Sequence, residues 1–358
     1  MSGLQRRNLL VAVGALGATT LLTACAPLQP SRPLERLLAL PQLNTSTALR
    51  VVYAHNLRYD RPAPGLIDQV LTQTQALCQA HFGLTLQMAE VQEVPISQLF
   101  SAITPVLWDK IKPQIYDFAD GRTRETLVKE MQRSVQNNKS PIAAQIQYAK
   151  AHLLSDTQPT DASSLARALI DTQLARFKTW HTLQGSDGLP LLDRSIYNEY
   201  FAWITAPRAQ PWPAEIVITN QLLASVEYEG NSLHSALRGG VSNGLTCVSP
   251  VSRYGTVSVL SLFPFINQAP LTRQLRGDVE ASAESATSTV TAAAALLTHE
   301  LGHQLLHLGH PFGQTACVMN PPELLRFDAW VKSLDAPQCP LGNHAENTLG
   351  AERFLASP

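Results

Sequence analysis

The stretch His299-Glu300-Leu301-Gly302-His303 stands near the end of a long run rich in alanine and leucine, and it decides how the rest of the chain is interpreted. On a helix, two residues four positions apart lie on one face about 6 Å apart, so the two imidazoles can bind one metal ion together. Glu300 follows the first histidine and can reach a water molecule that the metal polarises, which is the arrangement a zinc hydrolase needs. Glu300 is therefore the candidate general base.

The alternative is an ordinary helix that carries two histidines and a glutamate by chance. Residues 289–308 are mostly alanine, leucine, valine and threonine. Charged and imidazole groups on so apolar a helix are costly to bury unless they are paired or bound to a metal. The pattern therefore predicts that His299 and His303 bind zinc.

A third protein ligand must come from elsewhere in the chain. Gly309 is a natural left-handed end for a helix and Pro311 prevents its continuation, so a turn there would bring His310 to the metal from the opposite side. His307 extends the row of histidines, but three successive ligands on one straight helix rotate away from the metal. Glu323 lies twenty residues beyond the second histidine of the motif, a distance at which some zincins supply a glutamate. We favour His310 and keep His307 and Glu323 as alternatives.

The two-histidine motif, the Gly309-His310 pair and the run Cys317-Val318-Met319-Asn320 together resemble the metzincin metalloproteases, and most closely the archaemetzincin branch. In metzincins a methionine in a tight turn lies beneath the metal, and the resemblance gives that role to Met319, with ordinary core packing as the alternative. The resemblance covers roughly residues 49–100 and 211–345. It implies an α+β fold with a twisted mixed β-sheet and a long active-site helix, and a peptidase activity that depends on zinc.

The chain also departs from the family pattern. That pattern places a glycine seven residues and a third histidine ten residues after the first histidine, where this chain has Leu306 and Gly309, so that His310 comes one residue late. Archaemetzincins have a second zinc site of four cysteines, and Pro311 stands where the first of these would be. We therefore expect one catalytic zinc ion.

The first 25 residues predict a lipoprotein signal peptide. Arg6-Arg7 forms a positive segment, residues 9–22 are apolar, and the segment ends with Leu22-Thr23-Ala24-Cys25, which resembles a bacterial lipobox. The resemblance implies cleavage before Cys25 and a lipid on its sulfur, whereas an uncleaved anchor or a simple secretory peptide is the alternative. Ala26 in place of aspartate favours the outer membrane, on the periplasmic side of a bacterial cell envelope.

Four cysteines remain once Cys25 carries a lipid. In an oxidising compartment an even number of cysteines favours disulfides. The family resemblance implies a Cys317–Cys339 disulfide that replaces the lost second zinc site. Cys78 and Cys247 either pair or stay buried as small apolar residues.

Four segments follow the signal peptide in the predicted domain organisation. Residues 26–48 are rich in proline and predict a tether between the membrane and the folded part. Residues 49–100 predict a strand, a helix and a second strand, and with residues 211–358 they form the predicted catalytic domain. Residues 101–210 hold several amphipathic helical stretches, and we interpret them as a helical insertion that a compact zincin core does not need.

The second half of the predicted catalytic domain carries strands before the long helix. Residues 215–219 and 256–263 are rich in β-branched and apolar residues and predict strands. Residues 240–248 are our candidate for the edge strand that holds an extended peptide in metzincins, with an ordinary hairpin as the alternative. We expect a loop at 265–278 and a helix at 323–334.

The composition excludes some partners. The formal net charge is −1, which indicates neither a nucleic-acid partner nor a polybasic membrane surface. After the signal segment, no stretch stays apolar over the about 18 residues that a membrane helix needs. We expect a monomer that hydrolyses a peptide or protein substrate, with a cell-wall peptide as a further candidate. The alternative is a non-catalytic, zinc-stabilised envelope lipoprotein that binds a partner through its helical insertion.

Overall fold

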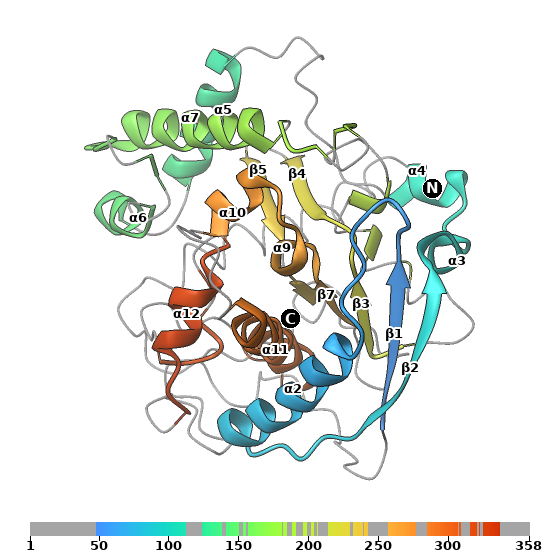
Figure 1. Ribbon diagram of the computed structural model, residues 1–358. Helices are drawn as coiled ribbons and strands as arrows, with labels where there is room; N and C mark the ends of the chain where they lie inside the picture. Colours follow the sequence, from blue (N-terminus) through green and yellow to red (C-terminus); the bar gives the residue numbers. More distant parts are fainter. Residues whose placement is uncertain are drawn as a thin grey trace, which may run out of the picture. The chain divides into compact units, whose positions relative to one another are not determined.

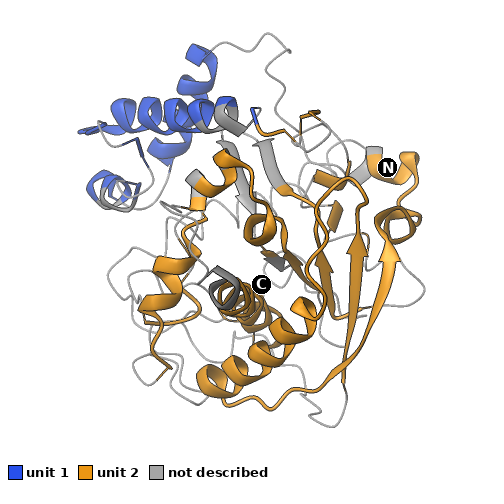
Figure 2. Ribbon diagram, in the orientation of Figure 1, with its two compact units in different colours: residues 1–32, 111–182, 225–236 blue, residues 33–110, 183–224, 237–358 orange. Residues whose placement is uncertain are grey.

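The computed structural model describes residues 48–111, 124–137, 141–149, 153–154, 157–180, 182–184, 188–190, 196–198, 202–203, 206, 214–229, 232–238, 240–242, 257–276, 285–306, 308, 316–320, 322 and 325–336. These residues divide into two compact units, of which unit 1 takes those within 111–182 and 225–236, and unit 2 takes the others (Figure 2). The predicted signal peptide, Cys25 and residues 26–47 of the predicted tether lie outside the described residues. Among the helices that are described, none is both long and apolar enough to span a membrane.

Unit 2 is built on a mixed sheet of five strands in the order β2-β1-β3-β7-β6 (Figure 1). The first four strands in this order are parallel to one another, and β6 is antiparallel to β7 and ends the order. The strands are β1 (Leu49–His55), β2 (Met88–Pro95), β3 (Ile216–Thr219), β6 (Gly240–Ser242) and β7 (Ser258–Ser261). Every residue of β3 and β7 is buried, as expected for central strands of a parallel sheet. The mixed sheet and its helices agree with the predicted α+β class.

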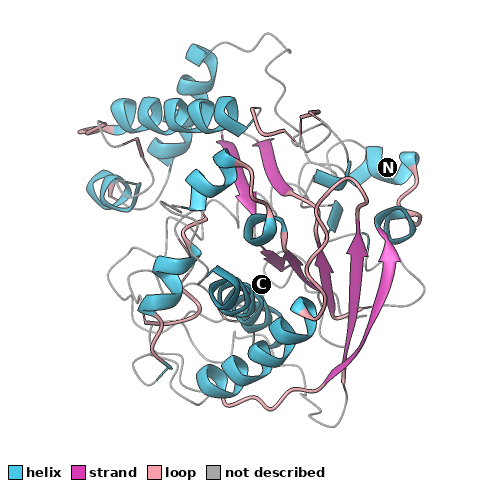
Figure 3. Cartoon of the chain, in the orientation of Figure 1, coloured by secondary structure: helices cyan, strands magenta, loops and turns pink. Residues whose placement is uncertain are grey.

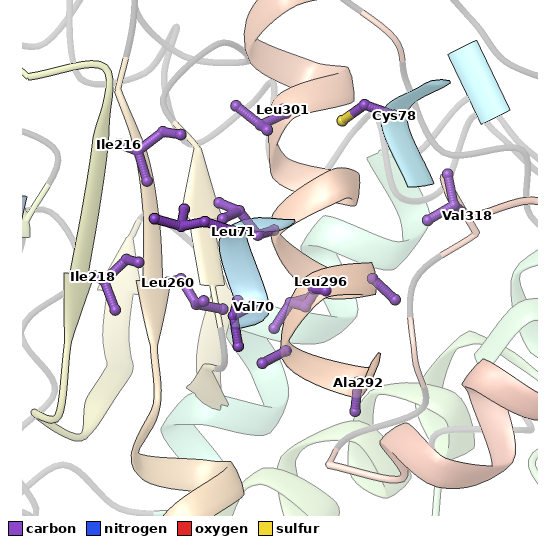
Figure 4. Packing of buried hydrophobic residues seen from close by; sticks show 14 of the residues in the cluster. Val70, Leu71, Cys78, Ile216, Ile218, Leu260, Ala292, Leu296, Leu301 and Val318 are labelled. Carbon is purple, nitrogen blue, oxygen red and sulfur yellow. The ribbon is translucent and has the colours of Figure 1, made fainter. Parts of the chain in front are cut away.

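Two long helices, α2 (Leu66–Phe82) and α11 (Ser285–Leu306), pack against each other, and their apolar residues share one core with the strands (Figure 4). Glycines with positive φ stand at both ends of α2, and Gly83 ends it in a left-handed conformation with its N–H bonded to the Gln79 carbonyl at 3.1 Å. The alanines at 292–295 of α11 are all buried. Small side chains there let α11 come close to its neighbours, which fixes the helix that carries the candidate site.

The loop predicted at 265–278 contains the end of the short helix α9 (Phe263–Ile266) and the whole of α10 (Pro270–Arg276) (Figure 3). Pro270 is the first residue of α10. Proline suits this position because its φ is already fixed and a first-turn N–H has no partner within the helix. Arg276 Nη1 donates to three carbonyls at the end of α9, at 2.9 to 3.2 Å, those of Pro264, Phe265 and Asn267. The loop prediction was wrong: Pro270 was a local signal for a helix start, and the Arg276 contact, which joins residues up to twelve positions apart, leaves no local pattern.

The helix predicted at 323–334 begins later, since α12 spans Phe327–Ser333. Arg326 has a non-helical backbone with φ −79° and ψ 58°, and the Phe327 N–H bonds to the Leu325 carbonyl at 2.9 Å. The Leu325 side chain is buried in the core of unit 2. Burial of Leu325 therefore fixes a turn at 325–326, where helical propensity alone would already place residues in the helix.

The remaining described elements of unit 2 are the short helices α3 (Ile96–Phe100) and α4 (Pro105–Ile111), whose last residue falls in unit 1, and a 3₁₀ turn at Ile196–Asn198. A separate two-stranded sheet pairs β4 (Leu223–Glu229) with β5 (Ser232–Arg238).

Unit 1 is mainly helical and contains α5 (Arg124–Asn137), α6 (Ile142–Ala149) and α7 (Ala162–Trp180). The guanidinium of Arg124 in α5 donates to both carboxylate oxygens of Asp171 in α7, at 2.6 and 2.7 Å. Asp161 caps the start of α7 by accepting the Ser164 N–H at 2.7 Å. The described helices between 124 and 180 have the character predicted for the insertion, whereas its boundaries at 101 and 210 stay a prediction.

Candidate metal centre

Helix α11 brings His299 and His303 together, as their spacing predicts. Their Nε2 atoms are 3.1 Å apart, and the two rings meet edge to face with centroids 4.6 Å apart. Both residues are almost fully buried, with exposed fractions of 4% and 2%. Two nitrogens bound to one zinc ion at about 2.0–2.1 Å in tetrahedral geometry would lie about 3.3 Å apart. The pair therefore has the separation that a shared zinc ion requires.

The other ring nitrogen of each histidine contacts a main-chain carbonyl. His299 Nδ1 lies 2.9 Å from the Val318 oxygen, and His303 Nδ1 lies 2.5 Å from the Leu308 oxygen. A carbonyl only accepts, so each Nδ1 carries the proton and each Nε2 presents a lone pair. Zinc-binding histidines are held in this way, because the partner of the second nitrogen selects the tautomer and orients the ring.

Burial keeps both imidazoles neutral at pH 7. Desolvation lowers the pKa of His299 to about 4, and desolvation together with the neighbouring His299 lowers the pKa of His303 to about 3. The carbonyl hydrogen bonds act in the opposite direction but are weaker. Two neutral rings that both carry their proton on Nδ1 cannot hydrogen-bond to each other through Nε2. Their facing lone pairs repel unless a cation lies between them, and this observation fits zinc.

Met319 lies beneath α11 in a tight turn, where the Asn320 N–H bonds to the Cys317 carbonyl at 2.9 Å. Met319 is fully buried, and a Cβ placed on Gly302 would collide with its Sδ. Gly302 therefore lets the methionine pack directly under the helix between the two histidines. The same turn supplies the Val318 carbonyl that orients His299.

Glu300 points toward strand β6 from the neighbouring position on α11. A Cβ placed on Gly240 would lie 2.8 Å from Glu300 Oε1. The Glu300 side chain has little solvent exposure, with a residue value of 6%. The candidate base therefore lies between α11 and β6, the last strand in the order of described strands, and it follows His299 directly in the chain.

Trp330 of α12 packs beside His299. The centroids of the two rings are 6.4 Å apart, and the ring planes make an angle of 79°. The indole Nε1 donates to the Asn320 carbonyl at 2.7 Å. Trp330 thus connects α12 both to the turn that contains Met319 and to the first histidine. Its place in the site was not predicted, because no local signal distinguishes it from an ordinary core tryptophan.

Gln304 fixes α11 against the sheet and was also missed. It is fully buried; its Oε1 accepts from Ser258 Oγ of β7 at 2.6 Å, and its Nε2 donates to the Glu215 carbonyl at 3.1 Å. The Glu215 carboxylate in turn accepts from Arg50 N and Nε at 2.7 and 3.0 Å. One possible signal was its place directly after the second histidine, since a polar side chain there is costly to bury without partners.

Several predicted site residues lie outside the part of the chain that the structure describes. The three candidates for the third ligand, His310, His307 and Glu323, lie outside the described residues. Within the described ranges, no group of three His, Cys, Asp or Glu residues could hold a metal ion. Cys317 is buried, but its predicted partner Cys339 lies outside the described part, so the disulfide stays a prediction. The same holds for a Cys78–Cys247 pair, of which Cys78 is described and buried.

No family model, curated protein or solved structure matches this chain. The interpretation of the site rests on its residues and their geometry.

Proposed function

We propose that the chain is a zinc-dependent metallopeptidase of metzincin-like fold, closest to the archaemetzincin branch, that hydrolyses peptide bonds in the bacterial cell envelope, where a lipid on Cys25 anchors it. The observation that carries the proposal is the pair of neutral, buried imidazoles whose Nε2 lone pairs face each other at 3.1 Å. Glu300, which follows His299 in the chain, and Met319, which packs against Gly302 between the two histidines in sequence, add to that support.

The arrangement of unit 2 supports the zincin and metzincin interpretation of its mixed sheet. The long helix with the histidines packs against β6 and β7. Strand β6 ends the strand order and lies beside Glu300, within the segment proposed to hold an extended peptide. An edge strand leaves backbone N–H and C=O groups free to pair with a peptide, so a substrate placed along β6 would lie near the base.

The described residues also support His310 over His307 as the third ligand. Helix α11 ends at Leu306, and the Leu308 N–H bonds to the Gly302 carbonyl at 3.3 Å. A helical N–H bonds to the carbonyl four residues back, so this bond to the carbonyl six residues back shows that the chain has left the α-helical path at Leu308. A row of ligands along a continuing helix is therefore not favoured, whereas a turn after Leu308 fits a ligand from the opposite side.

The residues of the site divide the reaction among them. Zinc bound by the imidazoles would act as a Lewis acid and lower the pKa of a water molecule toward neutrality. In that case Glu300 would accept a proton from the attacking water as its oxygen bonds to the carbonyl carbon of the peptide bond. Glu300 then donates a proton to the leaving nitrogen as the C–N bond breaks. His299 and His303 keep their orientation throughout, because their Nδ1 protons are held by the Val318 and Leu308 carbonyls.

The test compares the full chain, purified in detergent, with its Glu300→Gln variant on an unbiased peptide mixture, with zinc content measured in both. Glu300→Gln keeps the size of the side chain and removes the base, so we expect about 10²–10⁴-fold slower cleavage with zinc retained. Zinc in both proteins with cleavage in neither would favour the non-catalytic, zinc-stabilised lipoprotein. Absence of zinc from both would reject the metal centre. A His310→Ala variant that keeps full zinc and activity would reject His310 as a ligand.

A further inference from the structure

Strand β6 presents a residue without a side chain to the helix that carries the candidate base. Gly240 pairs with Leu260 of β7, and cross-strand partners project to the same face of a sheet. Leu260 lies in the core that contains α11, so the missing Cβ of Gly240 is also on the α11 side. The built Cβ confirms this direction, because its nearest neighbours are all atoms of Glu300.

The space at this point is too small for any side chain. A Cβ on Gly240 would lie 2.8 Å from Glu300 Oε1, 3.0 Å from Cγ and 3.2 Å from Cδ. Ordinary contacts of a Cβ atom are at 3.4–4 Å, so the carboxylate would have to move. Among the described glycines, Gly65, Gly83 and Gly188 have a positive φ, and Gly240 is not one of them. Glycine is therefore not required here by the backbone conformation, and the requirement comes from Glu300.

We propose that Gly240 is a positioning residue for Glu300, in that its bare backbone both makes room for the carboxylate and limits how far the carboxylate can move toward β6. The catalytic meaning of this contact rests on the proposed function, in which Glu300 is the base. A base misplaced by about 1 Å can slow a reaction by about 10²-fold. A methyl group at position 240 would require Glu300 Oε1 to move from 2.8 Å to the 3.4 Å of an ordinary contact, a displacement of about 0.6 Å.

The contact can be tested without any activity, in a double-mutant cycle of the full chain freed of metal with a chelator. The four proteins are the parent, Gly240→Ala, Glu300→Ala and the double variant, and the measurement is the melting temperature. With Glu300 present, Gly240→Ala should lower the melting temperature by about 2–4 °C or more. In the Glu300→Ala background the methyl group has room, and alanine is ordinarily better than glycine in a strand, so no fall is expected. Equal falls in both backgrounds would overturn the proposal.

Gly188→Ala is the matched control. Its φ of +74° makes alanine strained there, and nothing lies within 4 Å of the added Cβ. Because it does not touch Glu300, the melting temperature should fall equally in both backgrounds. If Gly188→Ala lowered the melting temperature by different amounts with and without Glu300, and this difference were as large as that for Gly240→Ala, the proposal would be overturned. The coupling to Glu300 would then not depend on contact with it.

The positioning role has its own measurement on the zinc-loaded full chain. Gly240→Ala should lower kcat by about 10- to 100-fold, with KM within about twofold of the parent and an unchanged zinc content. An unchanged kcat would overturn the positioning role even if the melting temperatures were coupled. If the parent cleaves no peptide, the proposed function fails, whereas coupled melting temperatures would still support Gly240 as the residue that seats Glu300.

Discussion

Main-chain carbonyls orient each histidine of the candidate metal centre before any metal binds. The Val318 carbonyl belongs to the turn that contains Met319, and the Leu308 carbonyl lies just beyond the end of α11. The motif therefore depends on two segments that carry no ligand among the described residues. A histidine held in this way loses little conformational freedom on binding, which favours tight metal binding.

At the scale of these residues we predict that acid destabilises the metal-free protein. The ordinary histidine pKa is 6.5, and the folded values of about 4 for His299 and about 3 for His303 are both lower. Below pH 6.5 the unfolded chain binds protons at these imidazoles while the folded chain does not. The free energy of unfolding should therefore fall, by up to about 1.4 kcal/mol per pH unit for each imidazole. The measurement is urea unfolding with a chelator between pH 7 and pH 5.

The matched control for the acid effect is His303→Gln, which removes one of the two imidazoles. The two imidazoles together cause part of the change in the free energy of unfolding with pH, and this variant should reduce that part by about half. A slope that is the same in the parent and in this variant would show that other groups cause the loss of stability.

At the scale of elements, Gln304 determines how α11 lies on the sheet. Its amide contacts β7 through Ser258 and the start of β3 through the Glu215 carbonyl, while the Glu215 carboxylate contacts Arg50 of β1. One side chain of the helix is thus connected to three neighbouring strands. A shift of α11 along its axis would break these two hydrogen bonds of Gln304. They therefore fix the position of the histidines along the helix axis relative to β6.

We predict that Gln304→Ala lowers the free energy of unfolding by about 2–4 kcal/mol, because the Ser258 hydroxyl and the Glu215 carbonyl lose a buried partner and a cavity remains. Urea unfolding of the full chain measures the change. Gln69→Ala, at an exposed position of α2, is the matched control and should stay within about 0.5 kcal/mol of the parent. A loss at Gln304 as small as that at Gln69 would show that the buried hydrogen bonds contribute little.

The elements predicted from sequence were those whose cause is local. Periodicity placed β1, α2 and β2 because a strand alternates and a helix repeats within a few residues, and Gly83 marked the end of α2. The four-residue spacing of His299 and His303 was enough to predict that their rings meet. The roles of Gly240 and Trp330 depend on residues distant in the chain, and no local pattern contains that information. Pro270 at the start of α10 and the polar Gln304 after His303 were local signals, but the contacts that fix both elements join distant residues.

For the whole molecule, the proposed metal should stabilise one compact unit and not the other. The two histidines and the turn with Met319 belong to unit 2, whereas α5 and α7 with their Arg124–Asp171 pair belong to unit 1. A ligand that binds only the folded state, and whose concentration is about 1,000 times its dissociation constant, adds about 4 kcal/mol to the free energy of unfolding of the structure that binds it.

Removal of zinc with a chelator should therefore raise amide hydrogen exchange in residues 299–306 and 316–320, and leave exchange in α5 and α7 unchanged. Mass spectrometry of peptides from the full chain measures both regions in one experiment. The same experiment on His303→Ala, with no zinc to lose, is the control and should show no effect of the chelator. Equal increases in both units would mean that the metal stabilises the whole chain or that the chelator acts nonspecifically.

The order of strands in the sheet has a consequence for how the protein is made. β1 pairs with β3 across 165 residues of sequence. At about 5–20 residues per second, a ribosome needs roughly 8–30 seconds to add the missing partner after β1 has emerged. During that time β1 can pair only with β2, and its other edge is open to strands of other chains. We expect a chain that ends before Ile216 to aggregate, because β3 is then absent and one edge of β1 stays open.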